Sequence, residues 1–173
     1  MIEISSSFIF ILRKKIKDTI VNIKERTNDT MIREIKGNIF DHITENDYIA
    51  HCISGDFALG AGIAKEIDKR YGVKNVLKSN PDFKKYQSGT GYVLVTDKVF
   101  NLITKEKYWQ KPNYCTLEKC LETLVQMCNG HHLRSIHMPR IGCGLDQLDW
   151  RIVYPMITRI FKDSGIDVNI YYL

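Results

Sequence analysis

The hydrophobic positions of this chain follow two different periods, and the period changes several times along the sequence. Short runs of continuous or alternating apolar residues predict β-strands, whereas apolar residues spaced three and four apart predict amphipathic helices. The predicted strands cover residues 31–35, 48–54, 91–97, 99–105, 133–141 and 167–173. The predicted helices cover residues 63–72, 116–130 and 150–165.

Glycine and proline mark the ends of several predicted elements. Gly72 and Gly130 close helical patterns and are expected to stop those helices. Pro155 lies inside the last helical pattern, so that helix must begin late or bend there. Residues 96–98 separate two strand patterns closely enough to predict a hairpin. The helix over 116–130 should bury one face, formed by Leu117, Leu121, Leu124 and Cys128.

Residues 1–30 differ from the rest of the chain. Apolar residues at positions 9, 12, 16, 20 and 23 have nearly helical spacing, with lysines between them, which predicts an amphipathic helix. Such a helix either packs on the domain or touches an acidic membrane surface, and a single short apolar stripe binds bilayers only marginally. We therefore interpret residues 1–30 as an N-terminal extension and residues 31–173 as one domain, and expect no membrane partner.

The alternation of strand and helix patterns from residue 31 onward predicts the fold class. It is typical of an α/β fold in which helices cover both faces of a mixed central β-sheet, giving three α/β/α layers. The length of 173 residues suits one domain, and a hydrophobic fraction of 44% is that of an ordinary globular protein. Neither a disordered nor a fibrous chain is therefore expected.

Charge and cysteine content narrow the classes of partner and compartment. The net charge of +5 suits an anionic ligand but is weak support for a nucleic-acid groove. Five cysteines form an odd set without metal-ligand spacing, which favours reduced thiols inside a cell, in the cytoplasm or nucleus, over a disulfide scaffold. The histidines never fall four residues apart on a helical pattern, so we expect no metal site and no cofactor.

Two glycine-rich turns follow predicted strands and precede predicted helices. They are residues 60–62 (Gly-Ala-Gly) and residues 142–144 (Gly-Cys-Gly). Backbone N–H groups at such a turn, with the dipole of the next helix behind them, bind phosphate without a cationic side chain. Both can equally be packing turns, with Asp146 or Asp149 as an ordinary helix cap. The residues alone leave both interpretations open.

Six short motifs occur in the order and spacing of a macrodomain. They are IKGNIF at 35–40, AHCIS at 50–54, GAGIA at 60–64, LITK at 102–105, KPNY at 111–114 and MPRIGCGLDQLDW at 138–150. Together they resemble the macrodomain subfamily of terminal ADP-ribose protein glycohydrolases, also described as O-acetyl-ADP-ribose deacetylases. The resemblance covers residues 31–173, and its last motif is the most specific. The family fold, a mixed sheet between helices, agrees with the alternation above.

The resemblance implies an ADP-ribose site assembled from these motifs. Ile39 would line the adenosine end, Ser54 would end a strand against the ligand, and Leu173 would touch the nucleotide. The two glycine turns would surround the diphosphate and the distal ribose. The implied binding residues are Asn38, Ile39, Ser54, Gly60, Ala61, Gly62, Arg140, Ile141, Gly142, Cys143, Gly144, Leu145 and Leu173. Asn38 is a departure, because many macrodomains have there an aspartate that accepts from the adenine amino group, and asparagine accepts without charge.

The resemblance places the two catalytic residues of the subfamily at Lys105 and Asp146. A lysine amine can attack the anomeric carbon of an ADP-ribose ester to give a Schiff-base type adduct. Only the neutral amine attacks, and because the reference pKa of lysine is about 10.4, a base must take its proton or burial must lower its pKa. Asp146 would be that base and would later activate water. Considered alone, Lys105 is a solvated charge or an ion-pair partner, and Asp146 is a helix cap.

Other reactive or aromatic residues receive structural interpretations. Cys143 is expected to be a small buried thiol and not a nucleophile. His51 and His137 lie within apolar strands and are expected in the core or the pocket wall. Trp109 and Tyr114 lie near Lys105, where they could stack on a ring or cover the core, and we favour covering.

Three functions are compatible with the implied site. The first is a hydrolase that removes ADP-ribose from glutamate or aspartate esters and deacetylates O-acetyl-ADP-ribose. The second is a non-catalytic reader of ADP-ribose, and the third is a phosphatase acting on ADP-ribose 1''-phosphate. The expected partners are ADP-ribose, its esters and ADP-ribosylated proteins, with ADP-ribosylated nucleic acid as a further substrate, and the protein is expected to be a monomer.

Overall fold

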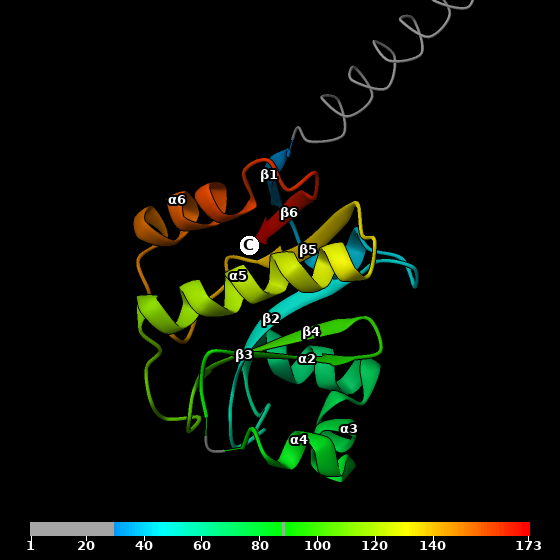
Figure 1. Ribbon diagram of the computed structural model, residues 1–173, viewed down its shortest axis with the longest axis vertical. Coiled ribbons are helices and arrows are strands. Elements are labelled where there is room, and N and C mark those ends of the chain that lie inside the picture. Colours follow the sequence, from blue (N-terminus) through cyan, green and yellow to red (C-terminus); the bar gives the residue numbers. More distant parts are fainter. Residues whose placement is uncertain (1–29, 88) are drawn as a thin grey trace, which may run out of the picture.

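The computed structural model describes residues 30–87 and 89–173 (Figure 1). The predicted extension, residues 1–30, lies outside this part of the chain apart from Thr30. The strands are β1 (Ile32–Lys36), β2 (Ile49–Ser54), β3 (Tyr92–Thr96), β4 (Val99–Lys105), β5 (Ser135–Pro139) and β6 (Asp167–Tyr172). The helices are η1 (Ile39–Asp41), α2 (Gly62–Tyr71), α3 (Val73–Ser79), α4 (Pro81–Lys84), α5 (Tyr114–Gly130) and α6 (Trp150–Phe161). Within these residues, none of the helices has the length and apolar character needed to span a bilayer.

The six strands form one mixed sheet in the order β1-β6-β5-β2-β4-β3. All neighbouring pairs are parallel except β3 and β4, which form the predicted antiparallel hairpin. Asp97 in the hairpin turn has a φ of 53°, a left-handed conformation that aspartate tolerates. The prediction of a mixed sheet is therefore confirmed.

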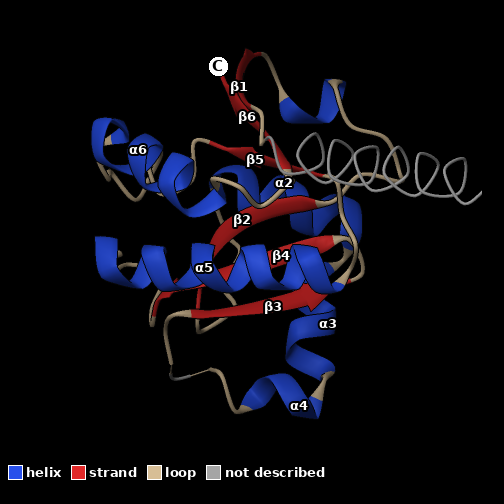
Figure 2. Cartoon of the chain, turned by 45° about the horizontal axis from the view of Figure 1, so that its top comes forward, coloured by secondary structure: helices blue, strands red, loops and turns tan. Residues whose placement is uncertain are grey.

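Helices cover both faces of the sheet and produce the predicted three layers (Figure 2). Helices α5 and α6 pack on one face against a core that includes Phe100, Leu102 and Ile136. Helices α2 and α3 pack on the other face, where Ile67 and Leu77 contribute to a second core cluster. The predicted apolar face of α5 is confirmed, because Leu117, Leu121, Leu124 and Cys128 are all fully buried.

Three details differ from the sequence prediction. Helix α6 begins at Trp150, so a late start caused by Pro155 is wrong; Asp149 caps the helix and the proline lies within it. Strand β5 is shorter than predicted at both ends. Two short helices, α3 and α4, occupy a segment for which no element was predicted, and α4 starts where Asn80 accepts a hydrogen bond from the N–H of Asp82, 2.9 Å away.

The sheet topology defines the edge at which a ligand can bind. Five of the strands are parallel, so their carboxyl ends lie along one edge. In the middle of the sheet, β2 and β5 share the single residue pair Ile49–His137, at the start of β2 and away from this edge. The chain leaves β2 toward β4 and β3, whereas the segments after β4 return to β5 and β6 on the other side. Open α/β sheets bind ligands in the crevice at such a reversal.

Candidate functional site

The two predicted catalytic residues meet at this edge. Lys105 is the last residue of β4, and Asp146 lies in the loop that follows β5. The amino group of Lys105 donates to Oδ1 of Asp146, and each side chain is only 14% exposed. Because 41 residues separate the two in sequence, the pair exists only in the folded chain. The structure thus brings together the residues that the resemblance selected.

A β-bulge precedes Lys105. Strands β2 and β4 pair regularly up to Ile53 and Ile103, after which Ser54 pairs with Lys105 and Thr104 is passed over. A bulge bends its strand and redirects the side chains beside it. The hydroxyl of Thr104 is buried and has no hydrogen-bond partner among residues 30–87 and 89–173. The sheet therefore ends irregularly at the lysine, where a regular strand would have continued the alternation of faces.

Asp146 does not cap helix α6. The cap is Asp149, whose carboxylate accepts from the N–H of Arg151 at 2.9 Å. The backbone N–H of Asp149 in turn donates to the hydroxyl of Tyr114 at the start of α5, 3.1 Å away. The interpretation of Asp146 as a helix cap is wrong, so its carboxylate is available to Lys105.

A second contact ties the same two segments together. The amino group of Lys111 donates to the side-chain carbonyl of Gln147. We call Lys105, Lys111, Asp146 and Gln147 the lysine end of the site. Every charged or amide group in this set is bonded to another member of the set, from a distant segment of the chain.

The two glycine turns lie next to each other and present free backbone donors. A Cβ atom placed on Gly62 would lie 3.3 Å from Cδ1 of Leu145, which puts the first turn in contact with the second. Helix α2 begins after Ala61 without a side-chain cap, so its first N–H groups have no acceptor among residues 30–87 and 89–173. In the described part of the chain, the N–H groups of Gly144, Leu145 and Asp146 have no acceptor. Such donors at neighbouring turns can bind an anion such as a diphosphate.

The four glycines of these turns differ in whether the fold itself requires glycine at their position. Gly62 and Gly142 have φ angles of 55° and 72°, which residues other than glycine rarely adopt. At Gly142 a Cβ would also come within 2.8 Å of Leu148. Gly60 and Gly144 have neither constraint, and a Cβ there would meet no atom within 4 Å. The fold does not require glycine at these two positions, whereas a closely bound ligand would.

Arg140 has a different environment from the one that the resemblance implied. Its guanidinium pairs with Glu34 of β1, with Nε and Oε1 2.9 Å apart, and lies 4.1 Å above the ring of Tyr172. The indole of Trp150 donates to the same carboxylate oxygen at 3.0 Å. We call Glu34, Arg140, Trp150 and Tyr172 the arginine end. Its side chains are bonded to one another, so the guanidinium is already engaged by the fold.

The remaining predicted binding residues divide by exposure. Leu173 and Leu145 are 96% and 72% exposed. Ile39 and Ile141 are almost fully buried and pack within the two core clusters. The role of Ile39 at the adenosine end stays a prediction.

Asn38 and Ser54 already form hydrogen bonds with neighbouring residues. Asn38 is exposed and accepts from the N–H of Phe40 at 3.1 Å, which caps η1. The hydroxyl of Ser54 donates to Asp56 at 2.5 Å. Both residues lie at the carboxyl edge of the sheet, and each supports the local backbone there.

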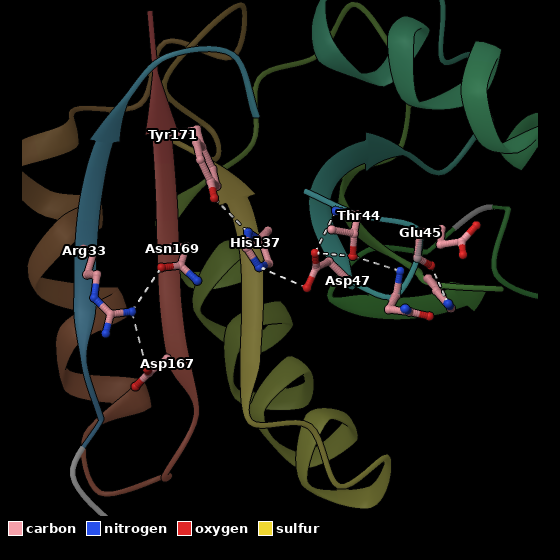
Figure 3. Close-up of polar contacts among 10 residues, drawn as sticks. Arg33, Thr44, Glu45, Asp47, His137, Asp167, Asn169 and Tyr171 are labelled. Carbon is pink, nitrogen blue, oxygen red and sulfur yellow. Dashed lines mark hydrogen bonds and ion pairs between the residues drawn. The ribbon is translucent and has the colours of Figure 1, made fainter. Parts of the chain in front are cut away.

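The buried histidines occupy the core as expected. His137 on β5 contacts the hydroxyl of Tyr171 on β6 at 2.9 Å, and its other ring nitrogen is 3.6 Å from the carboxylate of Asp47 (Figure 3). That carboxylate also accepts from the N–H and hydroxyl of Thr44, so the network holds the segment after η1 against the sheet. Burial lowers the pKa of His137, and the charge of Asp47 opposes that shift.

His51 is fully buried on β2, and the charge of Asp68 acts on it more weakly than its burial does. Its Nε2 is 2.8 Å from the side-chain oxygen of Asn101 on β4, the strand that ends at Lys105. Burial lowers the pKa of His51 to about 4, although the hydrogen bond with Asn101 opposes the shift. A neutral histidine here is structural.

Cys143 and the aromatic residues near Lys105 complete the sequence predictions. Cys143 is only partly buried, so the prediction of a buried thiol is wrong in that respect. Burial still raises the pKa of its thiol to about 11, and the thiol lies 3.4 Å from the carbonyl of Ile141, which supports its assignment as a non-nucleophile. Tyr114 packs against the core as expected. Trp109 does not: it is 67% exposed, so the expectation that it covers the core is wrong.

Sequence reasoning missed two residues that support the site. Asp56 accepts hydrogen bonds from the hydroxyl of Ser54 and the N–H of Tyr108, and so links β2 to the turn after Lys105. Its position two residues after a strand-ending serine is typical of a turn that a side chain stabilises. No local pattern predicted the bond between Glu34 on β1 and Arg140, 106 residues away.

Metal ligands, or a hollow elsewhere in the described residues, could form a second site. Across residues 30–87 and 89–173, no three side chains of histidine, cysteine, aspartate or glutamate are grouped as metal ligands. A hollow of about 560 Å³ lies between α4 and the edge strand β3, and a smaller one lies between β1 and α6. Neither contains a predicted site residue.

Comparison with known proteins identifies the family. Residues 50–157 match the Macro domain family. Over 155 residues the chain is 36% identical to a human protein named ADP-ribose glycohydrolase OARD1, which covers 88% of this chain and 98% of that protein. The cattle protein of the same name is 36% identical over 152 residues, covering 86% and 96% of the two chains.

Solved structures agree on the fold. The macrodomain of Thermus aquaticus DarG has a TM-score of 0.72 at 21% identity and covers 84% of this chain and all of that one. Thermosipho africanus DarTG, solved in complex with ADP-ribose, has a TM-score of 0.69 at 21% identity over 83% of this chain and 42% of that one. With its three-layer fold, its paired glycine turns and these matches, the chain belongs to the macrodomain family.

Proposed function

We propose that this protein is a hydrolase that releases ADP-ribose from carboxylate esters, with Lys105 as the attacking amine and Asp146 as the base. The substrates are esters of ADP-ribose with glutamate or aspartate side chains, and O-acetyl-ADP-ribose. Support comes from the relatives named ADP-ribose glycohydrolase, which match nearly the whole domain. It comes equally from the site itself.

The observation that carries the proposal is the ion pair between Lys105 and Asp146. A protein that only binds ADP-ribose has no need for an amine and a carboxylate in contact at the end of its ligand site. Both side chains are 14% exposed and belong to different segments, so the fold holds the pair in a largely buried place. The free N–H groups of Gly144 and Leu145 lie beside it, where they would bind the diphosphate and direct the distal ribose toward the lysine.

The chemistry follows from the contact. Asp146 takes a proton from Lys105, and the neutral amine forms a bond between Nζ and the anomeric carbon of the distal ribose. The bond from that carbon to the carboxylate oxygen breaks, and the carboxylate leaves with the electron pair. Asp146 gives the proton it took from Lys105 to the leaving carboxylate, which becomes the carboxylic acid, and is then a base again. Water, activated by Asp146, attacks the adduct, and the bond between Nζ and the anomeric carbon breaks to free the lysine. The net reaction consumes one water and gives ADP-ribose and a carboxylic acid.

The proposal also covers the carrier, which is the molecule to which ADP-ribose is attached, and the cellular compartment. We propose that the ester is carried mainly by proteins inside a cell, in the cytoplasm or nucleus, and that the enzyme acts as a monomer. The five cysteines are unpaired, which is the state that a reducing compartment maintains. ADP-ribosylated nucleic acid remains a further substrate to be tested.

The experiment is to incubate the protein with three substrates and follow the release of ADP-ribose by chromatography. The substrates are a polypeptide mono-ADP-ribosylated on glutamate, O-acetyl-ADP-ribose and ADP-ribose 1''-phosphate. Hydrolysis of the first two without the third is expected. Tight binding of ADP-ribose with no turnover would show a reader instead, and turnover of the phosphate alone would show a phosphatase.

A further inference from the structure

Two large aromatic side chains lie exposed directly after the catalytic lysine. Tyr108 and Trp109 are 64% and 67% exposed, and their rings form a perpendicular pair with centroids 5.0 Å apart. Neither ring is needed by the core, in contrast to Tyr114 six residues on, which packs into it. Contiguous exposed apolar surface of this kind marks an interaction site more often than single exposed residues do.

The loop that carries this pair is firmly bonded. The N–H of Tyr108 donates to Asp56 at 3.2 Å, and the N–H of Asp56 donates to the carbonyl of Glu106 at 3.0 Å. Within the loop, the N–H of Lys107 donates to the side chain of Gln110 at 2.8 Å. The rings are therefore held outward by an ordered backbone. A partner that binds a pre-ordered surface loses less conformational entropy.

The position of the pair indicates which part of a substrate it would meet. This step rests on the proposed function. If Lys105 attacks the anomeric carbon, the bond that breaks joins that carbon to the carrier, so the carrier begins within a few ångströms of the lysine amine. Tyr108 and Trp109 follow Lys105 by three and four residues. The glycine turns hold the nucleotide side, which leaves this pair for the carrier side.

The charge around the pair distinguishes a protein carrier from a nucleic acid. Lys107 and Glu106 are both exposed and opposite in sign, Asp56 lies beneath them, and the Lys111 amine is bonded to Gln147. A single-stranded nucleic acid binds where several cations follow its phosphates. Tyrosine and tryptophan in a surrounding of mixed charge are instead typical of protein-binding hot spots.

We propose that Tyr108 and Trp109 form a docking site for the polypeptide that carries ADP-ribose. The rings bind an apolar or aromatic side chain close to the modified residue in the carrier. The pair thereby selects among ADP-ribosylated proteins without contacting ADP-ribose itself.

The test compares a substrate with a carrier and a substrate without one. The double variant Tyr108→Ser with Trp109→Ser is compared with the full-length protein and with Val76→Ser, which removes another exposed apolar residue, on α3. The substrates are a polypeptide mono-ADP-ribosylated on glutamate, O-acetyl-ADP-ribose and an ADP-ribosylated single-stranded oligonucleotide. We expect kcat/KM of the double variant on the polypeptide to fall at least tenfold, mainly through KM. On O-acetyl-ADP-ribose it should change less than twofold, and Val76→Ser should match the unmodified protein on both.

The other outcomes overturn the proposal in distinct ways. An equal loss on the polypeptide and on O-acetyl-ADP-ribose would mean that the loop only positions Lys105. A loss confined to the oligonucleotide would mean that the carrier is a nucleic acid. If the unmodified protein hydrolyses nothing, the proposed function fails, and docking is judged by calorimetry instead. Docking then requires the ADP-ribosylated polypeptide to bind at least threefold tighter than free ADP-ribose, and this gain must vanish in the double variant.

Discussion

The lysine end and the arginine end lie on the same edge of one sheet, but their charged groups have different kinds of partner. At the lysine end, Lys105 is paired with Asp146, another predicted site residue. At the arginine end, Arg140 is paired with Glu34 on the outermost strand and packs on Tyr172. One end holds two reactive groups in contact, and the other ties the loop after β5 to β1 and β6.

This difference shows how a charged residue inside a binding motif should be interpreted. Both Lys105 and Arg140 belong to motifs that resemble those of the macrodomain family. The identity of the bonded partner separates their roles, because a partner from the site implies chemistry and a partner from the scaffold implies support. We therefore expect substitutions at the lysine end to change turnover, and substitutions at the arginine end to change stability.

The largest effect is expected at Asp146. Asp146→Asn should lower turnover by a factor of about 10²–10⁴, because the base is lost while the shape is kept. Unfolding free energy should change by at most about 1 kcal/mol, because Asp149 and not Asp146 caps α6. With an ester substrate the lysine of this variant can still attack slowly, while the adduct has lost the base that activates water. The variant should therefore accumulate Lys105 covalently joined to ADP-ribose, visible by intact mass spectrometry.

Lys105→Ala serves as the matched control for that experiment. It should bind ADP-ribose, form no adduct and show no turnover. Near-normal hydrolysis by either variant would contradict the two-residue mechanism and would favour attack by water alone.

A pH-dependent effect on stability is expected at His51, which contacts Asn101 on β4, the strand that ends at Lys105. The folded pKa of His51 is about 4, and the unfolded value is about 6.5. Between these values the unfolded chain binds a proton that the folded chain does not, so the unfolding free energy falls as the pH falls from about 6.5 to about 4. The loss approaches about 3 kcal/mol at the acid limit.

Urea denaturation at pH 7 and pH 5 measures this slope. His51→Gln should flatten it, whereas His132→Asn, at an exposed position, should leave it unchanged. His137 on β5 has the carboxylate of Asp47 nearby, which opposes the lowering of its pKa, so its contribution should be smaller. An unchanged slope in His51→Gln would assign the pH dependence to other groups.

Two glycines of the same turn, Gly142 and Gly144, are expected to differ in what they support: the first the stability of the fold, the second the binding of the ligand. Gly142→Ala should cost about 2 kcal/mol of stability, because its φ of 72° is strained for alanine and the new Cβ would meet Leu148. Gly144→Val should change stability by less than about 0.5 kcal/mol, since nothing lies within 4 Å of its Cβ position. It should instead weaken ADP-ribose binding by at least about fivefold in calorimetry, or about 1 kcal/mol. Unchanged affinity in Gly144→Val would show that the turn only packs.

The smallest effect is expected from breaking the arginine end. Glu34→Gln should lower stability by about 1 kcal/mol, since the pair with Arg140 is partly exposed to solvent. ADP-ribose affinity should stay within a factor of two. If Arg140→Met lowered the affinity tenfold while Glu34→Gln did not, Arg140 would be a ligand of the diphosphate, as the resemblance implied. Thermal denaturation and calorimetry on the same samples separate these results.

Much of the fold followed from local patterns. Periodicity predicted every strand and three helices, because each buries a regular set of apolar residues. The predictions failed where one local signal outweighed another, or where an element was too short to show a periodic pattern. Pro155 did not delay α6, since Asp149 fixed the start of the helix before it. Helix α3 escaped notice because only Val73 and Leu77 are buried, too few to create a periodic pattern.

The site was less predictable than the fold. The pairing of Lys105 with Asp146 came from a resemblance, because their 41-residue separation leaves no local signal. The bond between Glu34 and Arg140 and the exposure of Trp109 were not predicted for the same reason. Each depends on which segments the sheet places side by side. Spacing along the chain can nominate such residues, but only the packed sheet decides their partners.

Asp149 caps α6, whereas Asp146 is bonded to Lys105, and this separation affects how the function of such domains can change in evolution. Because the cap is Asp149, if Asp146 is the base, as proposed, selection can act on Asp146 through turnover with little effect on stability. A gene duplicate could lose hydrolysis by one substitution at this position and still encode a stable ligand-binding domain. The reverse change is equally short, provided that the lysine is retained. On this proposal, an enzyme and a reader built on this loop would differ by a single substitution.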